Sequence, residues 1–330
     1  MPRKARIDAA GALHHVIGRG IERRKIFHDD ADRAAFLGRL ARILAETRTD
    51  CLAWALIPNH FHLLLRTGAV PIATVMRRLL TGYAQDYNRR HHRHGQLFQN
   101  RYKSILCQEE TYLLELVRYV HLNPLRARLV QTLEELDAYP YSGHSVLMGK
   151  TQALRQDVDS VLGQFGATVR TARKGYRAFV EQGASQGRRY DLVGGGLIRS
   201  TGGWKEVLEQ RARGIRTKGD ERILGDGPFV EQVMRQSEAR LERHMRLRLE
   251  GYDLPRLAQE VEARLGIDPL AHRGRYRGVV EARRVFCYWA VHELGWNGTA
   301  VAHALGLTQA AVSMAVKEGE RIVRERGWSL

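Results

Sequence analysis

Two histidines separated by a single residue, His60 and His62, are the sharpest chemical signal in the sequence. They open the run HFHLLL, whose composition predicts a β-strand. Alternate residues of a strand face the same side, so both imidazoles project together while Phe61 points into the core. Two neutral imidazoles on one face can hold a divalent cation when a third ligand completes the set. Two ordinary half-buried strand histidines would give the same pattern, so the pair alone does not distinguish a metal site from structural residues.

A second constellation, Tyr119 and Asn123, stands near the end of a predicted helix, in the sequence RYVHLNP. Residues four apart share a helix face. Pro124 disfavours helical backbone at Asn123, so the helix is expected to end there and the shared-face geometry is approximate. A tyrosine packed at a helix end, with Asn123 as its C-terminal cap, is the alternative interpretation.

The elements that would position these side chains alternate between strand-like and helix-like patterns up to about residue 150. Their order, β-α-β-β-α-β-α, predicts an α+β fold, a ferredoxin-like βαββαβ domain with an added C-terminal helix. The expected strands are 13–17, 51–57, 60–65 and 101–108, and the expected helices are 30–46, 72–89 and 111–122.

The rest of the chain reads as all-α, and three parts are expected. Residues 1–148 form the catalytic domain, 149–270 a helical connector of unassigned role, and 271–330 a helix-turn-helix domain. Glycine runs at 194–196 and 202–203 punctuate the connector. In the last part, helical patterns cover 279–294, 299–305 and 308–324, and Gly306-Leu307 would make the tight turn between the last two.

Three ordered motifs together resemble the HUH-type single-tyrosine transposases, and most closely the REP-associated tyrosine transposases. The similarity runs from about residue 14 to residue 142. The motifs are PNHFHLL from Pro58, GQLFQNRYKS from Gly95 and YVHLNP from Tyr119.

The resemblance implies a role for each member of the two constellations. His60 and His62 would be metal ligands, Tyr119 the nucleophile on a helix, and Asn123 a polar third ligand. In mobile-element relatives the third ligand is commonly glutamine, whose reach is longer. His121 is the local competitor for that ligand role.

The implied activity is that of a metal-dependent DNA endonuclease and transesterase. A Mg²⁺ or Mn²⁺ ion would polarise the phosphate, because a tyrosine with a reference pKa of about 10 is a weak nucleophile at neutral pH. A 5′-phosphotyrosine bond would keep the energy of the cleaved bond and allow strands to be rejoined. The expected substrate is single-stranded or hairpin DNA, with palindromic repeat elements as its source.

The charge of the chain suits a polyanionic partner. Its formal net charge is +17, from 53 Lys+Arg against 36 Asp+Glu. Such a field attracts nucleic acids, although charge alone also fits an RNA binder. In the catalytic part, Tyr102 is expected to stack on an unpaired base, and the expected phosphate contacts are Arg19, Arg101, Lys103 and Arg126. The cationic loop 88–94 (NRRHHRH) is expected to face DNA as well.

The C-terminal part resembles the helix-turn-helix of the bacterial replication initiator. It is expected to bind duplex DNA, with a core of Val301, Ala302, Leu305, Leu307, Val312 and Val316. The residues expected to face the DNA are Thr308, Gln309, Ser313 and Lys317. A packing or dimerisation domain with the same helix spacing is the alternative.

Two rival functions use the same signals. One is a DNA-binding regulator that kept the fold but lost cleavage, and the other is an RNA-directed binder or nuclease. The helix-turn-helix pattern favours duplex DNA over A-form RNA. Both histidines, Tyr119 and a polar residue at 123 occur together, which an inactive protein does not require.

The composition limits which kinds of site and which cellular compartment are expected. The three cysteines, Cys51, Cys107 and Cys287, are far apart and form no CxxC pair, so neither a disulfide framework nor a cysteine-rich zinc site is expected. No apolar run of about 18 residues occurs, so no membrane span is expected. The basic start is followed by no apolar signal region. A cytoplasmic protein, monomeric or homodimeric, is expected.

Overall fold

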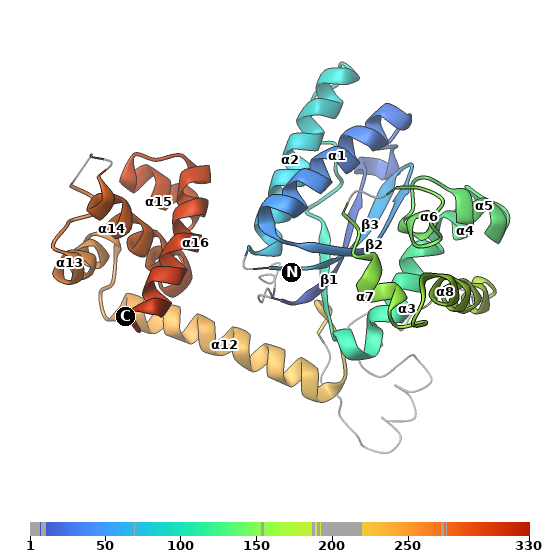
Figure 1. Ribbon diagram of the computed structural model, residues 1–330. Coiled ribbons are helices and arrows are strands. Elements are labelled where there is room, and N and C mark those ends of the chain that lie inside the picture. The colour runs from blue at the N-terminus through green and yellow to red at the C-terminus, as the bar shows by residue number, and fades with distance from the viewer. Residues whose placement is uncertain are drawn as a thin grey trace, which may run out of the picture. The chain divides into compact units, whose positions relative to one another are not determined.

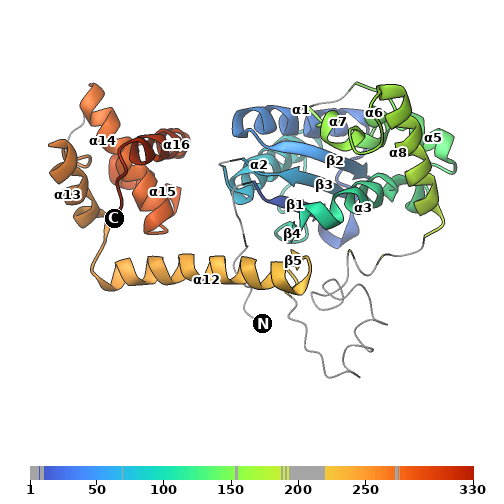
Figure 2. The same ribbon diagram turned by 60° about the horizontal axis from the view of Figure 1, so that its bottom comes forward.

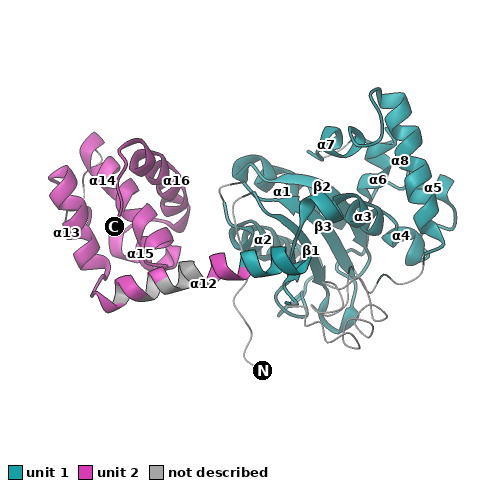
Figure 3. Cartoon of the chain, turned by 90° about the horizontal axis from the view of Figure 1, so that it is seen from below, with its two compact units in different colours: residues 1–233 teal, residues 234–330 magenta. Residues whose placement is uncertain are grey.

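The computed structural model describes residues 7, 11–68, 70–152, 155–186, 189, 192, 220–271, 274 and 276–330 (Figure 1). The chain divides into two compact units, residues 1–233 and 234–330 (Figure 3). The segment 149–270, expected as a separate connector, is divided between them. Helices near its start belong to the core of the first unit, and a helix near its end belongs to that of the second. The glycine runs at 194–196 and 202–203 lie outside the described residues.

A five-stranded sheet forms the centre of the N-terminal unit, in the order β2-β3-β1-β4-β5. The first four strands run antiparallel to their neighbours, and β5 pairs with β4 in parallel at the edge of the sheet (Figure 2). Order and direction of these four strands are those of a ferredoxin-like domain, as predicted. The strands are β1 (Leu13–Arg19), β2 (Asp50–Ile57), β3 (His60–Arg66), β4 (Lys103–Cys107) and β5 (Ile223–Leu224).

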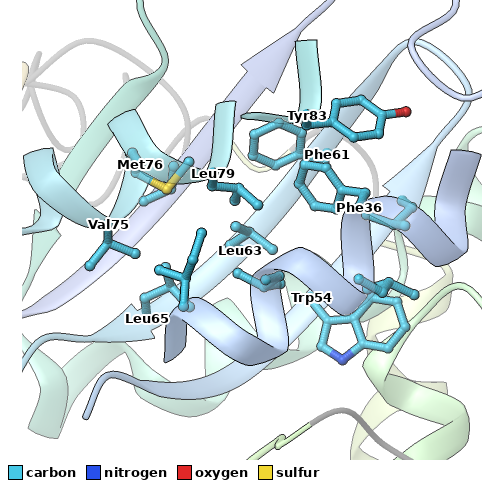
Figure 4. Close-up of a cluster of buried hydrophobic side chains, with 14 of the residues drawn as sticks. Phe36, Trp54, Phe61, Leu63, Leu65, Val75, Met76, Leu79 and Tyr83 are labelled. Carbon is cyan, nitrogen blue, oxygen red and sulfur yellow. The ribbon is translucent and has the colours of Figure 1, made fainter. Parts of the chain in front are cut away.

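Helices α1 (Asp30–Thr47) and α2 (Ile72–Arg90) cover one face of this sheet (Figure 3). Phe36 from α1 and Tyr83 from α2 meet Phe61 of β3 in a buried hydrophobic cluster (Figure 4). Asp29 caps the start of α1 by accepting a hydrogen bond from the Asp32 backbone amide. The strand residues on this face therefore pack in the hydrophobic core.

The other face carries α3 (Glu109–His121) and several short helices after it. Leu64 and Ala55 of the sheet join Val120 of α3 in a second buried cluster. Tyr176 extends this cluster from α8, so residues well past 148 complete the domain. The helices are α4 (Asn123–Arg126), α5 (Leu133–Ala138), α6 (Gly143–Leu147), α7 (Val158–Leu162) and α8 (Val169–Ala184).

Strand β1 is longer than predicted and passes through Gly18 to Arg19. A Cβ atom at Gly18 would lie 2.3 Å from Cζ of Phe61. Gly18 therefore lets the Phe61 ring pack directly against β1, and the strand does not end at this glycine. The short strand β5 was not predicted.

The C-terminal unit is helical, as predicted. Helix α12 (Gly227–Leu249) crosses the boundary between the units, and α13 (Leu254–Leu265) follows. Helix α14 (Arg277–Tyr288) continues into a π-helical turn at Trp289–Glu293. Helices α15 (Gly298–Leu305) and α16 (Gln309–Glu325) are joined at Gly306, which has the left-handed φ of 63° that favours glycine. Buried residues of α13, α14, α15 and α16 form its hydrophobic core.

The described residues contain no single helix that is both long and apolar enough to cross a membrane; only α15 and α16 taken together meet these criteria, and that pair is bent by 99°. Cys51, Cys107 and Cys287 are free and buried.

Candidate active site

His60 and His62 project from β3 on the face opposite Phe61. The strand register sets His60 across from Arg19 of β1, and His62 across from Ile17 of β1 and Ala55 of β2. Residues directly opposite in an antiparallel pair share a face, so Arg19 belongs to the same side of the sheet as the histidines.

Each histidine is held through its Nδ1 atom. The Nδ1 atom of His60 lies 2.7 Å from Oδ1 of Asn59, and the amide of Asn59 is oriented by its own donation to the Arg23 carbonyl at 3.1 Å. An amide oxygen only accepts, so Nδ1 of His60 donates and its Nε2 keeps a lone pair. The Nδ1 atom of His62 lies 3.0 Å from Nε2 of His15, which again leaves Nε2 of His62 for another partner. Such back-side hydrogen bonds orient metal-binding imidazoles.

Both imidazoles favour the neutral form. Burial, with a smaller contribution from the Arg19 charge, lowers the pKa of His60 to about 4. Burial and the neighbouring His15 hold the pKa of His62 well below its usual value of 6.5. A neutral imidazole is the form that binds a metal ion, so this pair of donors fits a divalent cation. In the described part of the chain, no group of three or more His, Cys, Asp and Glu side chains is placed to hold a metal ion.

Tyr119 of α3 lies over the same face. The centre of its ring is 5.9 Å from that of His62 and 5.8 Å from that of His15, both in edge-on arrangements. The structure thus brings together the two histidines and the tyrosine, which are 57 or more positions apart in the sequence (119 − 62 = 57). Sequence reasoning missed His15. Its position in a predicted strand was the available signal, but only the register reveals the face.

Asn123 lies one turn after Tyr119, as the first residue of α4. Its side-chain amide nitrogen donates to the carbonyls of Tyr119 at 2.8 Å and Val120 at 3.2 Å. It therefore caps the end of α3, the alternative that the sequence left open. The amide oxygen of Asn123 takes no part in this cap.

His121, the local competitor, takes part in a different network. It is fully buried, and its Nδ1 atom lies 2.7 Å from the hydroxyl of Tyr176 on α8. The same hydroxyl lies 2.7 Å from Nδ1 of His144, whose Nε2 lies 2.8 Å from Oδ1 of Asp137. These contacts engage His121 with α6 and α8 and not with the histidine pair.

Arg126 is half-buried beside the tyrosine. Its guanidinium carbon lies 5.1 Å from the centre of the Tyr119 ring, and Nη1 donates to the Tyr119 carbonyl at 3.4 Å. Its Nε atom is buried and has no hydrogen-bond partner in the described part of the protein. Burial lowers the pKa of this arginine, although the guanidinium stays charged at neutral pH. A cation with an unused donor is suited to a phosphate beside the phenol.

The remaining expected DNA contacts of this unit differ in exposure. Arg19, Arg101 and Lys103 are exposed, and Lys103 lies across from Ile17 on the histidine face. Tyr102 is only 9% exposed and belongs to the core beneath α1 and α2. The expectation that Tyr102 stacks on a base is therefore wrong for this conformation, since its ring is enclosed by core residues.

The cationic loop 88–94 is only partly available to DNA. Arg90 forms an ion pair with Asp29 at 2.5 Å, and Nε2 of His91 lies 2.9 Å from Oδ1 of Asp32. These two side chains of the loop are bound within the protein by the N-cap residue Asp29 and by Asp32 of α1. His92 and His94 are exposed.

In the C-terminal unit, α15 and α16 differ in direction by 99°, close to the angle of helix-turn-helix modules. Thr308 caps α16, its hydroxyl accepting from the Ala311 amide at 3.2 Å. Ser313 and Lys317 are exposed one and two turns after the half-buried Gln309, on one side of the helix. Of the expected core, Val301, Ala302, Leu305 and Val312 are buried, and Leu307 and Val316 are partly buried against them.

Comparison with known proteins bears on the N-terminal unit. No curated protein matches the chain. Among solved structures, the chain is similar to a REP-associated tyrosine transposase bound to a REP hairpin, with 14% identity and a TM-score of 0.39, over 48% of this chain and 93% of that one. Residues 10–123, which include His60, His62, Tyr119 and Asn123, match the family described as "Transposase IS200 like". Over this segment the chain is accordingly similar to the IS200-like transposases.

Proposed function

We propose that the N-terminal unit cleaves and rejoins single-stranded or hairpin DNA through a 5′-phosphotyrosine intermediate on Tyr119. The observation that supports this most directly is the Tyr119 ring set 5.9 Å from His62, on the face of the sheet that carries both histidines. Packing of the tyrosine alone would not require two neutral imidazoles on the same face whose Nε2 atoms are available to bind an ion.

The proposed reaction is a transesterification. The Tyr119 oxygen attacks the phosphorus, a new P–O bond forms to tyrosine, and the bond between phosphorus and the 3′ oxygen breaks. The phenolic proton is lost to solvent water as the new bond forms. The departing 3′ oxygen is protonated to a hydroxyl. Attack of a 3′ hydroxyl on the phosphotyrosine reverses the steps and joins two strands.

The charged residues around the site favour a phosphate there. Arg19 and Arg126 both contribute to the low pKa of His62, so their positive field reaches the imidazole pair. The same field stabilises the negative charge of a phosphate in its transition state. A Mg²⁺ or Mn²⁺ ion, held by His60, His62 and, as the proposed third donor, Asn123, would polarise a non-bridging phosphate oxygen and orient the phosphate.

We also propose that the C-terminal unit binds duplex DNA through α16. The angle of 99° between α15 and α16, together with the row formed by Gln309, Ser313 and Lys317, supports this role. Its partner would be separate from the single strand at the active site. A catalytically inactive regulator would use the same module, and the cleavage experiment distinguishes it.

The test uses a labelled hairpin oligonucleotide with single-stranded flanks, incubated with the protein and Mg²⁺ or Mn²⁺. The unmodified protein is expected to give a covalent protein–DNA adduct on a denaturing gel, and Tyr119→Phe none. Tyr112→Phe, on the same helix, is the matched control and should keep the adduct. An adduct that survives in Tyr119→Phe would overturn the assignment of the nucleophile, and no adduct from the unmodified protein would favour the inactive regulator.

The histidine roles need a separate readout. His60→Ala and His62→Ala should abolish the adduct while hairpin binding, measured by gel shift, is kept. Loss of binding together with the adduct would point to unfolding and would remove the support for a metal role.

A further inference from the structure

Met314 is an apolar side chain on the outside of α16. It is 70% exposed, whereas the other large hydrophobic side chains of α15 and α16 are buried or partly buried. Ala310 is also exposed and lies one turn earlier, on the same side of the helix. These two side chains form an apolar patch near the start of α16. Apolar surface gains free energy when it leaves water, so the patch suits a contact with a partner outside the C-terminal unit.

The polar side chains beside this apolar patch are partly engaged within the unit. The Ser313 hydroxyl donates to the Gln309 carbonyl at 3.0 Å, and the Thr308 hydroxyl accepts from the Ala311 amide at 3.2 Å. A Cβ atom at Gly298 would lie 3.7 Å from Nε2 of Gln309, so the Gln309 amide lies beside the start of α15. Apolar contact is therefore the main way in which the middle of this face could distinguish one partner from another.

The surface around the apolar patch is positive. Residues 294–317 contain no Asp or Glu, although 36 of the 330 residues of the chain are acidic. Lys317 is exposed and lies three residues after Met314, on the same side of α16. The amide groups in the first turn of α16 add the positive end of a helix dipole. An apolar patch within a positive surface favours a polyanion that also displays apolar groups.

Duplex DNA has this combination of groups. Its major groove admits an α-helix, and the C5 methyl group of thymine is the apolar group displayed there. Phosphates flank the groove and suit a cation such as Lys317. A second copy of this chain is the other candidate partner, but a two-fold contact through this face would set the same positive surface against itself. The charge therefore favours DNA.

We propose that Met314, together with Ala310, contacts thymine methyl groups in the major groove, so that the C-terminal unit prefers duplex DNA with thymine at the contacted positions. The proposal rests on the proposed duplex binding by α16, and it names the base that this helix reads. An RNA duplex would lack the contact, because uracil carries no methyl group at C5.

The first experiment compares two duplexes that differ only in this methyl group. The probes are a labelled blunt duplex of alternating adenine and thymine and the same duplex with uracil in place of thymine. Fluorescence anisotropy measures their affinity for the Tyr119→Phe protein, so that cleavage does not interfere. The thymine duplex should bind about fourfold more tightly for each methyl group contacted, the value of one buried carbon. Equal affinities for the two duplexes would overturn the proposal.

Two further substitutions in the same protein test whether Met314 is the residue responsible. Met314→Ala should lose most of the preference for thymine over uracil. Leu249→Ala is the matched control, because it removes another exposed apolar side chain of the C-terminal unit, which is 87% exposed on α12, and it should keep the preference. A preference that Met314→Ala retains in full would assign the thymine contact to another residue and would overturn the proposal.

A second pair of probes separates the methyl group from the shape of the duplex. In an alternating guanine–cytosine duplex, 5-methylcytosine in place of cytosine adds a methyl group to the major groove at the same ring position. This change should raise the affinity, and it should do so less in Met314→Ala. No gain would mean that the protein reads the shape of A·T duplexes, which would contradict the methyl contact. Failure to bind any of the four duplexes would instead reject the proposed duplex binding itself.

Sedimentation of the protein without DNA tests the other candidate partner. Met314→Ala should sediment as the Tyr119→Phe protein does. A dimer that Met314→Ala converts into a monomer would assign the apolar patch to a second copy of the chain and would overturn the proposal.

Discussion

The guanidinium carbon of Arg126 lies 5.1 Å from the centre of the Tyr119 ring, and Nη1 of Arg126 also donates to the Tyr119 carbonyl at 3.4 Å. One arginine thus touches both the side chain and the backbone of the proposed nucleophile. Arg126 was expected to contact DNA phosphates in general, and its contact with Tyr119 makes the phosphate at Tyr119 its proposed partner.

The first prediction concerns this pair. Arg126→Gln should slow formation of the covalent adduct by about 10²-fold, the usual loss when one charge-stabilising donor is removed from a transition state. Hairpin affinity should change much less, because many other cations contribute to it. Single-turnover kinetics on the labelled hairpin measure the rate, and gel shift measures the affinity. Arg128→Gln removes an exposed charge two residues later and should be nearly silent; an equal effect of both substitutions would refute a specific role of Arg126.

The second prediction concerns the buried hydroxyl of Tyr176, which lies 2.7 Å from Nδ1 of both His121 and His144. Tyr176→Phe keeps the ring but leaves two buried imidazole nitrogens without this partner. Each such group costs about 1–3 kcal/mol, so the free energy of unfolding should fall by about 2–6 kcal/mol. Urea unfolding measures the change.

The matched control for Tyr176 is Tyr139→Phe. Tyr139 is partly buried, and no hydrogen bond of its hydroxyl occurs within the described residues. Its substitution should cost less than about 1 kcal/mol. If Tyr176→Phe lowers the free energy of unfolding no more than Tyr139→Phe does, the Tyr176 hydroxyl does not connect α3 to α8.

How far the sequence leads can be judged from particular residues. Alternation in HFHLLL was enough to separate His60 and His62 from Phe61, because side-chain direction in a strand is a local property. The order of the first four strands and the helix that carries Tyr119 also followed from local patterns. These local rules predicted the ferredoxin-like domain and its C-terminal helix.

Long-range contacts were beyond such rules. The hydrogen bond between His15 and His62 depends on the register of two strands 47 positions apart. Burial of Tyr102 depends on how α1 and α2 cover the sheet. Strand β5 comes from residues 223–224 and pairs with β4 across more than a hundred residues, a distance over which periodicity carries no information.

The third prediction concerns acid stability. Burial and the neighbouring His144 hold the pKa of His121 well below the usual 6.5, so His121 is neutral in the folded protein. As the pH falls below about 6.5, the unfolded chain binds a proton that the folded protein does not, and stability declines. Between about pH 7.5 and about pH 5.5 this group alone should cost about 1.4 kcal/mol.

The measurement is urea unfolding at about pH 7.5 and about pH 5.5 in metal-free buffer. His121→Gln should lose part of this pH dependence, about 1.4 kcal/mol, whatever its stability at neutral pH. His92→Gln, which removes an exposed histidine, should keep the dependence of the unmodified protein. A dependence in His121→Gln as steep as in the unmodified protein would contradict a buried neutral imidazole at this position.

The fourth prediction concerns the close approach of α16 to α14. A Cβ atom at Gly319 would lie 2.0 Å from the Arg284 carbonyl oxygen, so even Gly319→Ala forces the helices apart. The C-terminal unit should lose about 3 kcal/mol or more, as overpacked cores do. Gly298→Ala is the control, because its added carbon would meet only the Gln309 side chain at 3.7 Å. Thermal unfolding followed by tryptophan fluorescence reports on this unit when Trp54 and Trp204 of the other unit are replaced by Phe in both variants. Equal transitions for the two variants would rule out the close packing.

The fifth prediction concerns duplex recognition by α16. Lys317 is exposed two turns after Gln309, and Ser313 lies between them on the same side of the helix. If this side enters the major groove, Lys317→Gln should lower the slope of log affinity against log salt for duplex DNA by about 0.9, the effect of one phosphate contact. Ser313→Glu should weaken binding by about tenfold or more, because a carboxylate would face the DNA. Arg256→Gln removes an exposed charge of α13 and should leave the slope unchanged. The assay is fluorescence anisotropy with a labelled duplex over a salt series. If neither Lys317→Gln nor Ser313→Glu weakens duplex binding, packing or dimerisation is the better account of this unit. A recognition helix that loses a phosphate contact, or that places a carboxylate against the DNA, must bind the duplex more weakly.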